Sequence, residues 1–202
     1  MVEKRRYKKS EITRKKLIDA AIEVFREKGY SKARITDITK KVGLTHAAFY
    51  AYFKDKDDLV RSLIENVSQD LGRYTVLTGD AKAIDFDDPK ALKKTVSEVF
   101  AFYRDNLALH AAFIEGALQD KELRVLLQKI NKDLVTSVSK QIKEHKKAGK
   151  CDNWNPEVMG NLLVLILGYI AVISELGMLP ASRDVVIDST SKLLYAAFNY
   201  EK

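Results

Sequence analysis

The sequence has little of what interrupts helices or cross-links a chain. It contains 3 Pro, 9 Gly and 1 Cys among 202 residues. With so few helix breakers, long segments can run as uninterrupted helix. The single cysteine, Cys151, cannot form an internal disulfide, which is typical of proteins from a reducing compartment. We therefore expect a helix-rich, cytoplasmic chain.

Long apolar runs are also missing. The longest, Leu162–Ile173, is shorter than the ~20 residues that a membrane-spanning helix needs. The first residues, MVEKRRYKKSEITRKK, lack the apolar stretch of a secretory signal. Hydrophobic residues make up 46% and charged residues 31% of the chain, which excludes a disordered protein. We expect a globular protein without a membrane partner.

Signals for catalysis and metal binding are absent from the sequence. The three histidines, His46, His110 and His145, have no cysteine or acidic partners at the spacing of metal ligands. There is no nucleophile elbow and no glycine-rich phosphate loop. We therefore expect no enzyme activity, no cofactor and no metal.

Positive charge is present, and it is concentrated at one end of the chain. The formal net charge is +7. Residues 1–60 hold sixteen Lys and Arg against nine Asp and Glu, so they carry this whole excess, and the remainder is neutral. A basic unit beside a neutral one favours a polyanion-binding head on a body with another role. A lysine-rich solvated surface is the simpler alternative.

Helical periodicity dominates the chain, and no alternating strand pattern is convincing. Gly29 and Gly43 follow two apolar-striped segments at positions where helices end. Residues 78–88 and 148–156 read as loops. The sequence predicts an all-α fold of about nine helices, near residues 13–28, 35–42, 45–52, 57–71, 89–104, 107–119, 121–147, 157–178 and 182–200.

The two short helices around Gly43 form a helix-turn-helix pattern, in which the second helix enters the DNA major groove. Glycine suits this turn because it adopts a positive φ without strain. Thr45 is a good N-cap for the second helix. We predict an N-terminal arm and DNA-binding domain over residues 1–60, and a ligand-binding and dimerisation domain over residues 61–202.

The segment from Thr13 to Val60 resembles the DNA-binding domain of the TetR family of repressors. The resemblance rests on Phe25, Lys28-Gly29-Tyr30, Ile38, Gly43, Tyr50-Ala51-Tyr52-Phe53, Lys56 and Leu59. Two positions depart from the family pattern: Thr39 replaces a usual alanine, and Ala47 a frequent glycine. The resemblance implies a three-helix head, a C-terminal helical body, a homodimer and a small-molecule effector.

Roles in DNA binding follow from this resemblance and from helical spacing. Phe49 and Phe53 are expected to point inward and to pack against Phe25, Ile38 and Leu44. Thr45, His46 and Ala47 are expected to meet base edges, although the helix lacks the Arg, Lys, Asn and Gln side chains of bidentate base contacts. Phosphate contacts are expected from Tyr50, Tyr52 and Lys56, and more weakly from Arg34 and Thr36.

The basic arm ahead of the first helix has two interpretations. Lys4, Arg5, Arg6, Lys8 and Lys9 either reach a minor groove, as disordered basic arms do, or form a solvated tail.

The body is expected to dimerise through its last two helices. Residues 157–178 are apolar nearly all round, so a second copy is expected to cover part of this helix. Gly160 and Gly168 are expected to allow close approach of the helices. The predicted interface residues are Leu162, Leu165, Tyr169, Val186, Leu193, Leu194, Ala197 and Phe198.

The middle helices are expected to enclose an effector pocket. If Glu115 is buried there, a cationic ligand is one possible partner for its carboxylate. The candidate lining residues are Phe100, Tyr103, Leu107, His110, Phe113, Ile114, Glu115, Leu134 and Trp154.

Three functions are compatible with these sequence features. The first is a ligand-responsive repressor that binds a palindromic operator as a homodimer and is released by an unknown small molecule. The second is a regulator of the same fold without an effector, controlled by a partner protein. The third, less favoured, is a helical carrier whose basic head binds membrane lipid.

Overall fold

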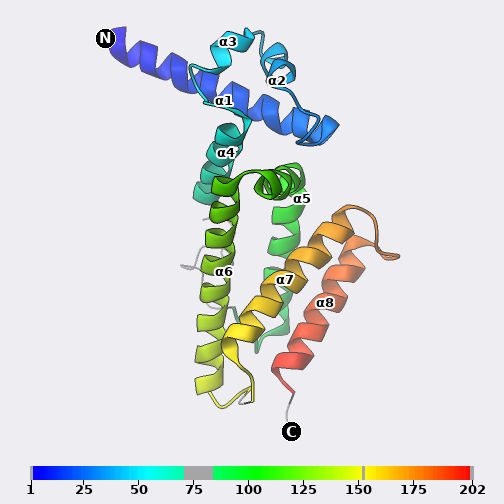
Figure 1. Ribbon diagram of the computed structural model, residues 1–202. Coiled ribbons are helices and arrows are strands. Elements are labelled where there is room, and N and C mark those ends of the chain that lie inside the picture. Colours follow the sequence, from blue (N-terminus) through cyan, green and yellow to red (C-terminus); the bar gives the residue numbers. More distant parts are fainter. Residues whose placement is uncertain (1, 71–83, 152, 201–202) are drawn as a thin grey trace. The chain divides into compact units, whose positions relative to one another are not determined.

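The computed structural model describes residues 2–70, 84–151 and 153–200, and within these residues it contains helices joined by turns and loops, without strands (Figure 1). This confirms the all-α expectation. Eight helices lie in these ranges: α1 (Val2–Lys28), α2 (Ile35–Lys41), α3 (His46–Phe49), α4 (Lys56–Asp70), α5 (Pro89–Gln119), α6 (Lys121–Lys147), α7 (Pro156–Glu175) and α8 (Arg183–Phe198).

The chain forms two compact units that do not coincide with the boundary expected at residue 60. Unit 1 comprises residues 1–68 together with 108–127, and unit 2 comprises residues 69–107 and 128–202. The end of α5 and the start of α6 therefore belong to the N-terminal unit. We call residues 108–127 the α5–α6 corner.

Unit 1 is built on α1, with α2 and α3 on one side of it and α4 on the other (Figure 1). Its core contains the buried face of α1 together with Ile38, Phe49, Phe53 and Leu63. Phe49 and Phe53 are in contact, with ring centroids 5.5 Å apart. Their predicted inward orientation is confirmed.

Unit 2 has two apolar clusters that join α5, α7 and α8. One contains Val96 and Phe100 from α5, Ala171 from α7, and Val186 and Ile187 from α8. The other lies nearer the connection between α6 and α7. It comprises Phe86, Leu92, Val138, Ile142, Leu163 and Phe198, with Trp154 packed against it.

Several helix boundaries differ from the sequence prediction. Helix α1 begins at Val2 rather than Thr13, and α3 ends at Phe49 rather than near Tyr52. The two helices expected over 89–104 and 107–119 are one helix, α5. The Asn106 side chain donates to the Phe102 carbonyl at 2.9 Å, within the helix, and does not cap a new one. Residues 78–83 of the predicted 78–88 loop lie outside the described residues.

Candidate nucleic-acid interface and effector cavity

A tight turn joins α2 to α3. Gly43 has φ of +67°, a left-handed conformation that glycine adopts at little cost. The Leu44 N–H bonds the Thr39 carbonyl at 2.9 Å and the Gly43 N–H bonds the Lys40 carbonyl at 3.3 Å. These two bonds form a Schellman motif, which satisfies the last carbonyls of α2. The turn therefore fixes the direction in which α3 begins.

Helix α3 is short, and its cap and its buried residue determine its position. The Thr45 hydroxyl accepts a hydrogen bond from the Ala48 N–H at 3.2 Å, as an N-cap does. Phe49 is completely buried beneath the helix. On the outer side, Thr45, His46 and Ala47 are exposed. The three residues predicted to meet base edges thus share the exposed start of one helix.

The two tyrosines after α3 differ in exposure. Tyr50 is 50% exposed, and its ring meets the His46 imidazole edge-on with centroids 5.2 Å apart. Tyr52 is half-buried. The contact between His46 and Tyr50 joins a predicted base-reading residue to a predicted phosphate-binding residue on one outer surface.

Lys56 does not project outward with Tyr50. Its ammonium donates to the backbone carbonyls of Tyr30, at 2.7 Å, and Ala33, at 3.2 Å. It also lies 4.0 Å from the centroid of the Tyr30 ring. Partial burial lowers the pKa of Lys56 below its ordinary value. In this structure Lys56 ties the α1–α2 loop to α4, which differs from the phosphate contact expected from its position.

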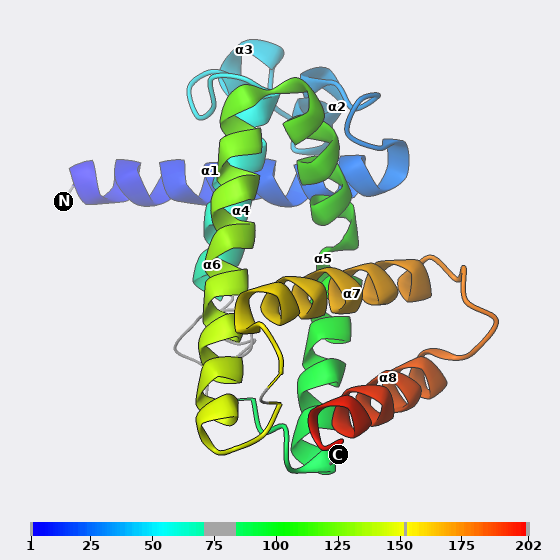
Figure 2. The same cartoon turned by 60° about the horizontal axis from the view of Figure 1, so that its bottom comes forward.

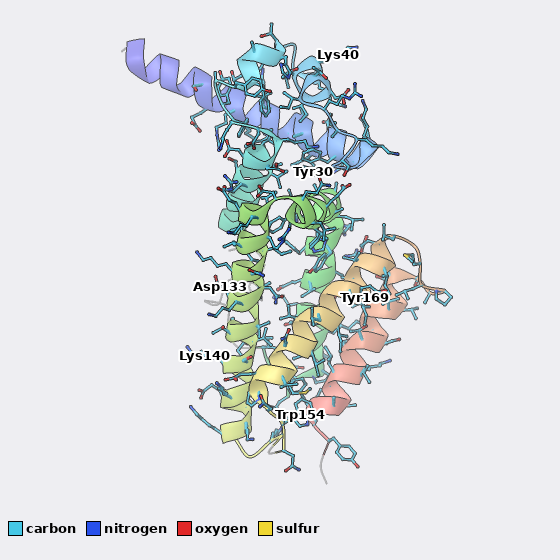
Figure 3. The ribbon with its side chains drawn as sticks, viewed as in Figure 1. Tyr30, Lys40, Asp133, Lys140, Trp154 and Tyr169 are labelled. Carbon is cyan, nitrogen blue, oxygen red and sulfur yellow. The ribbon has the colours of Figure 1, made fainter. Side chains whose placement is uncertain are left out.

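The loop between α1 and α2 has further ties. The Tyr30 hydroxyl donates to Asp57 in the first turn of α4, and the Ser31 hydroxyl donates to Glu115 in the α5–α6 corner. Burial raises the pKa of Asp57. Figure 3 shows Tyr30 at this junction of α1, α4 and the corner. Glu115 therefore belongs to unit 1 and braces the loop, and a cationic ligand is not needed to explain it.

The start of α2 is exposed, and the carboxylate of Asp37 accepts a hydrogen bond from the backbone there. Arg34 is the N-cap residue, and its N–H donates to Asp37 at 3.0 Å. The ammonium of Lys28, and then this Arg34 N–H, hold the pKa of Asp37 below its ordinary value. Thr36 is exposed beside Arg34. Thr39 is buried and bonds back to the Thr36 carbonyl at 3.4 Å, so the hydroxyl is accommodated within the helix.

An apolar cavity of about 60 Å³ lies within unit 2. This is several times the ~10–15 Å³ that one water occupies. Its lining residues carry no charge, and the hydroxyls of Thr95 and Tyr103 are the polar side-chain groups among them. Burial raises the pKa of Tyr103, so its hydroxyl is protonated at neutral pH. The lining residues are Ile84, Phe86, Leu92, Thr95, Val96, Val99, Tyr103, Leu134, Val138, Leu163, Val164, Leu167, Gly168 and Leu194.

Two of the nine predicted pocket residues, Tyr103 and Leu134, line this cavity. Phe100 is buried in the neighbouring apolar cluster, and Trp154 packs near Phe198. Leu107 is half-buried in unit 2 and absent from the lining. The other four, His110, Phe113, Ile114 and Glu115, lie in the α5–α6 corner of unit 1.

Burial lowers the pKa of His110, so its imidazole is neutral at neutral pH. Three of the cavity residues that the sequence prediction missed lie in a stripe on α5, where Leu92, Val96 and Val99 recur at helical spacing with the predicted Tyr103.

Helix α7 carries a row of exposed apolar side chains. Leu162, Leu165, Ile166 and Tyr169 recur at the spacing of one helical face. Tyr169 is 67% exposed, and its place on α7 is visible in Figure 3. Leu193 of α8 is exposed as well. By length and composition α7 is also apolar enough to cross a membrane. Its most apolar 18-residue stretch has a mean hydropathy of 2.0, and 22% of this stretch is buried inside the protein.

Part of the predicted dimer interface lies inside the protomer. Val186 and Phe198 are buried in the apolar clusters of unit 2, and Leu194 packs against both clusters. Ala197 is half-buried. The glycines of α7 also face inward: a Cβ on Gly160 would meet the Ser139 backbone, and one on Gly168 would meet Tyr103. Within the protomer, Val186, Phe198, Leu194 and the two glycines therefore contribute to the packing of unit 2.

Comparison with known proteins identifies the N-terminal domain. Residues 17–63 match the family described as "Bacterial regulatory proteins, tetR family". Residues 17–63 thus resemble the N-terminal domain of this family, and they make up less than a quarter of the chain. The helix-turn-helix formed by α2 and α3 lies within this match.

Two curated relatives from Bacillus subtilis match over this domain. The HTH-type regulator YvdT is 48% identical over 52 residues, which are 26% of this chain and 27% of YvdT. The fatty acid metabolism regulator protein is 41% identical over 49 residues, 24% of this chain and 25% of the relative. The matches thus span about a quarter of the length of these relatives.

Solved structures extend the likeness to the fold of nearly the whole chain. A transcriptional regulator FadR from B. subtilis, in complex with stearoyl-CoA, has a TM-score of 0.69 at 20% identity and covers 90% of this chain and 97% of its own. A regulator from Saccharomonospora viridis, in complex with choline, has a TM-score of 0.74 at 16% identity, covering 94% and 97%. At these identities the TetR-family fold is shared, and nothing more.

Proposed function

We propose that this protein is a ligand-responsive transcriptional repressor that binds a palindromic operator as a homodimer. The observation that carries the proposal is the Thr45-capped α3. It presents His46, Ala47 and Tyr50 outward over the buried Phe49. A helix held in this way can lie in a major groove with its first residues at the base edges.

The exposed row on α7 supports dimerisation. A row of large apolar side chains is unfavourable in water, and a second copy would cover it. Two copies would also supply the paired recognition helices that a twofold operator requires, about 34–36 Å apart. A membrane fits less well, because Gly160, Leu163, Gly168 and Ala171 pack one side of α7 against unit 2 itself. Asn161, at the edge of this buried side, is exposed and polar.

The cavity supports the proposal of an effector, and it indicates that the part of the effector bound inside unit 2 is uncharged. The lining offers apolar side chains and two hydroxyls but no acidic side chain to pair with a cation, so it fits an alkyl or acyl chain better. The stearoyl-CoA complex of the B. subtilis regulator is consistent with this class. Because the cavity is small, a longer chain would have to separate α5 from α7, and this separation would be the source of its effect on DNA binding.

The DNA-binding part is tested by selection from a random duplex pool. We expect a selected sequence with twofold symmetry and protection of both half-sites in a footprint. Thr45→Ala, which removes the N-cap of α3, should weaken binding to this sequence about 5-fold or more, since a lost cap costs about 1 kcal/mol. Failure to select any duplex would contradict the proposal.

The effector part is tested with fatty acids and acyl thioesters of increasing chain length, with choline as the charged comparison. We expect the acyl compounds to raise the melting temperature and to release the selected duplex. Leu134→Trp should block this response by filling the cavity. Thr136→Trp, two residues further along α6 on an exposed position, is the matched control. Release by choline alone would contradict the assignment of ligand class.

A further inference from the structure

The positive charge of the N-terminal region is not in the helix-turn-helix itself. Residues 1–16 hold eight Lys and Arg against two Glu, a net of +6. Residues 17–60 hold eight basic against seven acidic residues, a net of +1. The family match begins at residue 17, so the charge precedes the recognised domain. Nearly the whole excess of the chain therefore lies in the first half of α1.

This first half of α1 continues as helix beyond the core of unit 1. Of the side chains that the structure describes from Ser10 onward, Leu17 is the first that is buried, and the backbone continues as helix back to Val2. Both Figure 1 and Figure 2 show this stretch reaching past α2, α3 and α4. We call residues 2–16 the α1 extension. At 1.5 Å per residue it is about 20 Å long.

Six of the eight cations of the extension share one side of the helix by sequence spacing, and Arg6 and Arg14 fall outside it. At 100° per residue, Lys4, Arg5, Lys8, Lys9, Lys15 and Lys16 fall within an arc of about 140°. The buried Leu17 and Ala21 fall on the other side of α1. Lys15 and Lys16, on this basic side, are exposed.

Several cations within the helix-turn-helix domain are already engaged. Lys56 bonds two backbone carbonyls, Lys28 pairs with Asp37 at 2.7 Å, and Lys41 pairs with Glu23 and Glu27 at 3.1 and 2.8 Å. The recognition helix itself contains His46 and no Lys or Arg. This domain can position a helix on DNA, but it brings little net charge to attract phosphates.

A bare basic helix is unfavourable, and its diameter limits where it can bind. Lys4 with Lys8, and Arg5 with Lys9, are like charges four residues apart, which destabilise an isolated helix. A polyanion would relieve this repulsion. A helix is about 10–12 Å across and a minor groove about 6 Å wide, so the extension cannot enter that groove as a helix. It can lie along the phosphate backbone.

We propose that the α1 extension is a second DNA-binding element that contacts phosphates outside the recognition helix and supplies most of the salt-dependent affinity. The inference rests on the proposed DNA-binding function and concerns its energetics. Because phosphates carry no base information, the extension strengthens binding to every duplex alike. Specificity stays with α3.

The test compares three full-length variants in binding titrations against salt concentration. In the first, Lys4, Arg5, Arg6, Lys8 and Lys9 are changed to Gln. The second is the matched control, with the same loss of charge at exposed lysines outside α1–α4: Lys90, Lys121, Lys129, Lys132 and Lys140 to Gln. The third exchanges Lys for Arg and Arg for Lys at the five arm positions, which keeps their charge.

The probes are a duplex selected from a random pool and a mixed-sequence duplex. Each lost phosphate contact lowers the slope of log K against log salt by about 0.9, so we expect the first variant to lose about 2–4 units of slope. The loss should be equal on both duplexes. The charge-keeping variant should retain the wild-type slope, and all three should keep the wild-type melting temperature.

If the first variant had the same slope as the lysine control, the inference would be overturned, and the basic residues would be a solvated tail. The proposed function would be unaffected by this result. A loss confined to the selected duplex would also overturn it, since it would indicate base readout. If the wild-type chain binds neither duplex, the proposed function fails as well. The two failures are therefore distinguishable.

Discussion

The ammonium of Lys56 lies 4.0 Å from the centroid of the Tyr30 ring and donates to the Tyr30 carbonyl at 2.7 Å. One side chain at the start of α4 thus holds both the ring and the backbone of a residue in the α1–α2 loop. The loop precedes α2, whose last turn directs α3. Lys56 is therefore a positioning residue for the recognition helix in this structure, although its place in the sequence is that of a phosphate contact.

Replacing Lys56 with Ala should lower stability more than it lowers salt dependence. The loss of charged hydrogen bonds to two carbonyls is expected to cost about 1–2 kcal/mol, which a thermal melt can measure. The slope of log K against log salt should stay within error of wild type. Lys54, exposed two residues earlier, gives the matched control. Lys54→Ala should leave the melting temperature unchanged. A reduced slope of about 0.9 with an unchanged melt for Lys56→Ala would assign it to phosphate binding instead.

Charges placed in the exposed row of α7 should separate the dimer. The double variant Leu165→Glu, Tyr169→Glu would bury four carboxylates in the proposed interface, where desolvation is costly. We expect a monomer in sedimentation experiments. Leu118→Glu with Val125→Glu, at exposed apolar positions of the α5–α6 corner, should stay dimeric. Recovery of the wild-type chain in the membrane fraction would count against this explanation of the apolar row.

The ion pairs of Asp188 should make stability depend on acid pH. Its oxygens lie 2.6 Å from both Lys192 and Lys93, so it links α5 to α8. Lys192 first, and then Lys93, lower the pKa of Asp188 from 3.8 to about 2. A depressed carboxyl pKa contributes stability above the unfolded-state value, and this contribution is lost as pH falls through the folded-state value.

Asp188→Asn should therefore melt at a lower temperature than wild type at neutral pH. The difference should shrink as pH falls from 3.8 towards about 2. High salt should reduce it as well, because these side chains are partly exposed. A difference that is independent of both pH and salt would indicate a packing effect.

The two glycines of α7 should respond differently to alanine, although alanine usually favours a helix interior by about 0.5–1 kcal/mol. A Cβ at position 160 would lie 3.0 Å from the Ser139 backbone nitrogen and 3.2 Å from its Cα. Backbone cannot move aside easily, so Gly160→Ala should destabilise by about 1–3 kcal/mol.

At position 168 the Cβ would meet the Tyr103 hydroxyl oxygen at 2.7 Å, at the end of a side chain that borders the cavity. Gly168→Ala should therefore melt closer to wild type, but bind effector more weakly. Chemical denaturation and effector titration of both variants measure these effects. Equal destabilisation of the two would contradict this account of helix packing.

The sequence predicted local features well because their physical causes are local. The positive φ at Gly43, the Thr45 cap and the inward Phe49 each follow from a residue and its near neighbours. The direction of Lys56 could not be predicted in this way. It depends on carbonyls more than twenty residues earlier in the chain.

The cavity and the interface were predicted less well because both depend on which helices meet. Apolar periodicity marks Phe198 and Leu165 alike as apolar positions, and only packing separates the buried one from the exposed one. The residues from His110 to Glu115 were placed near a ligand because the sequence does not reveal that the α5–α6 corner packs with unit 1.

Helix α5 runs without interruption from Pro89 to Gln119. Its first half lines the cavity, and its last residues, including Glu115 and Gly116, contact the α1–α2 loop. A genetic selection for chains that stay bound to their operator in the presence of effector should therefore yield a class of mutants between these two stretches, near residues 104–107. Proline substitutions there would break the helix without changing the residues that line the cavity or the residues that contact the loop.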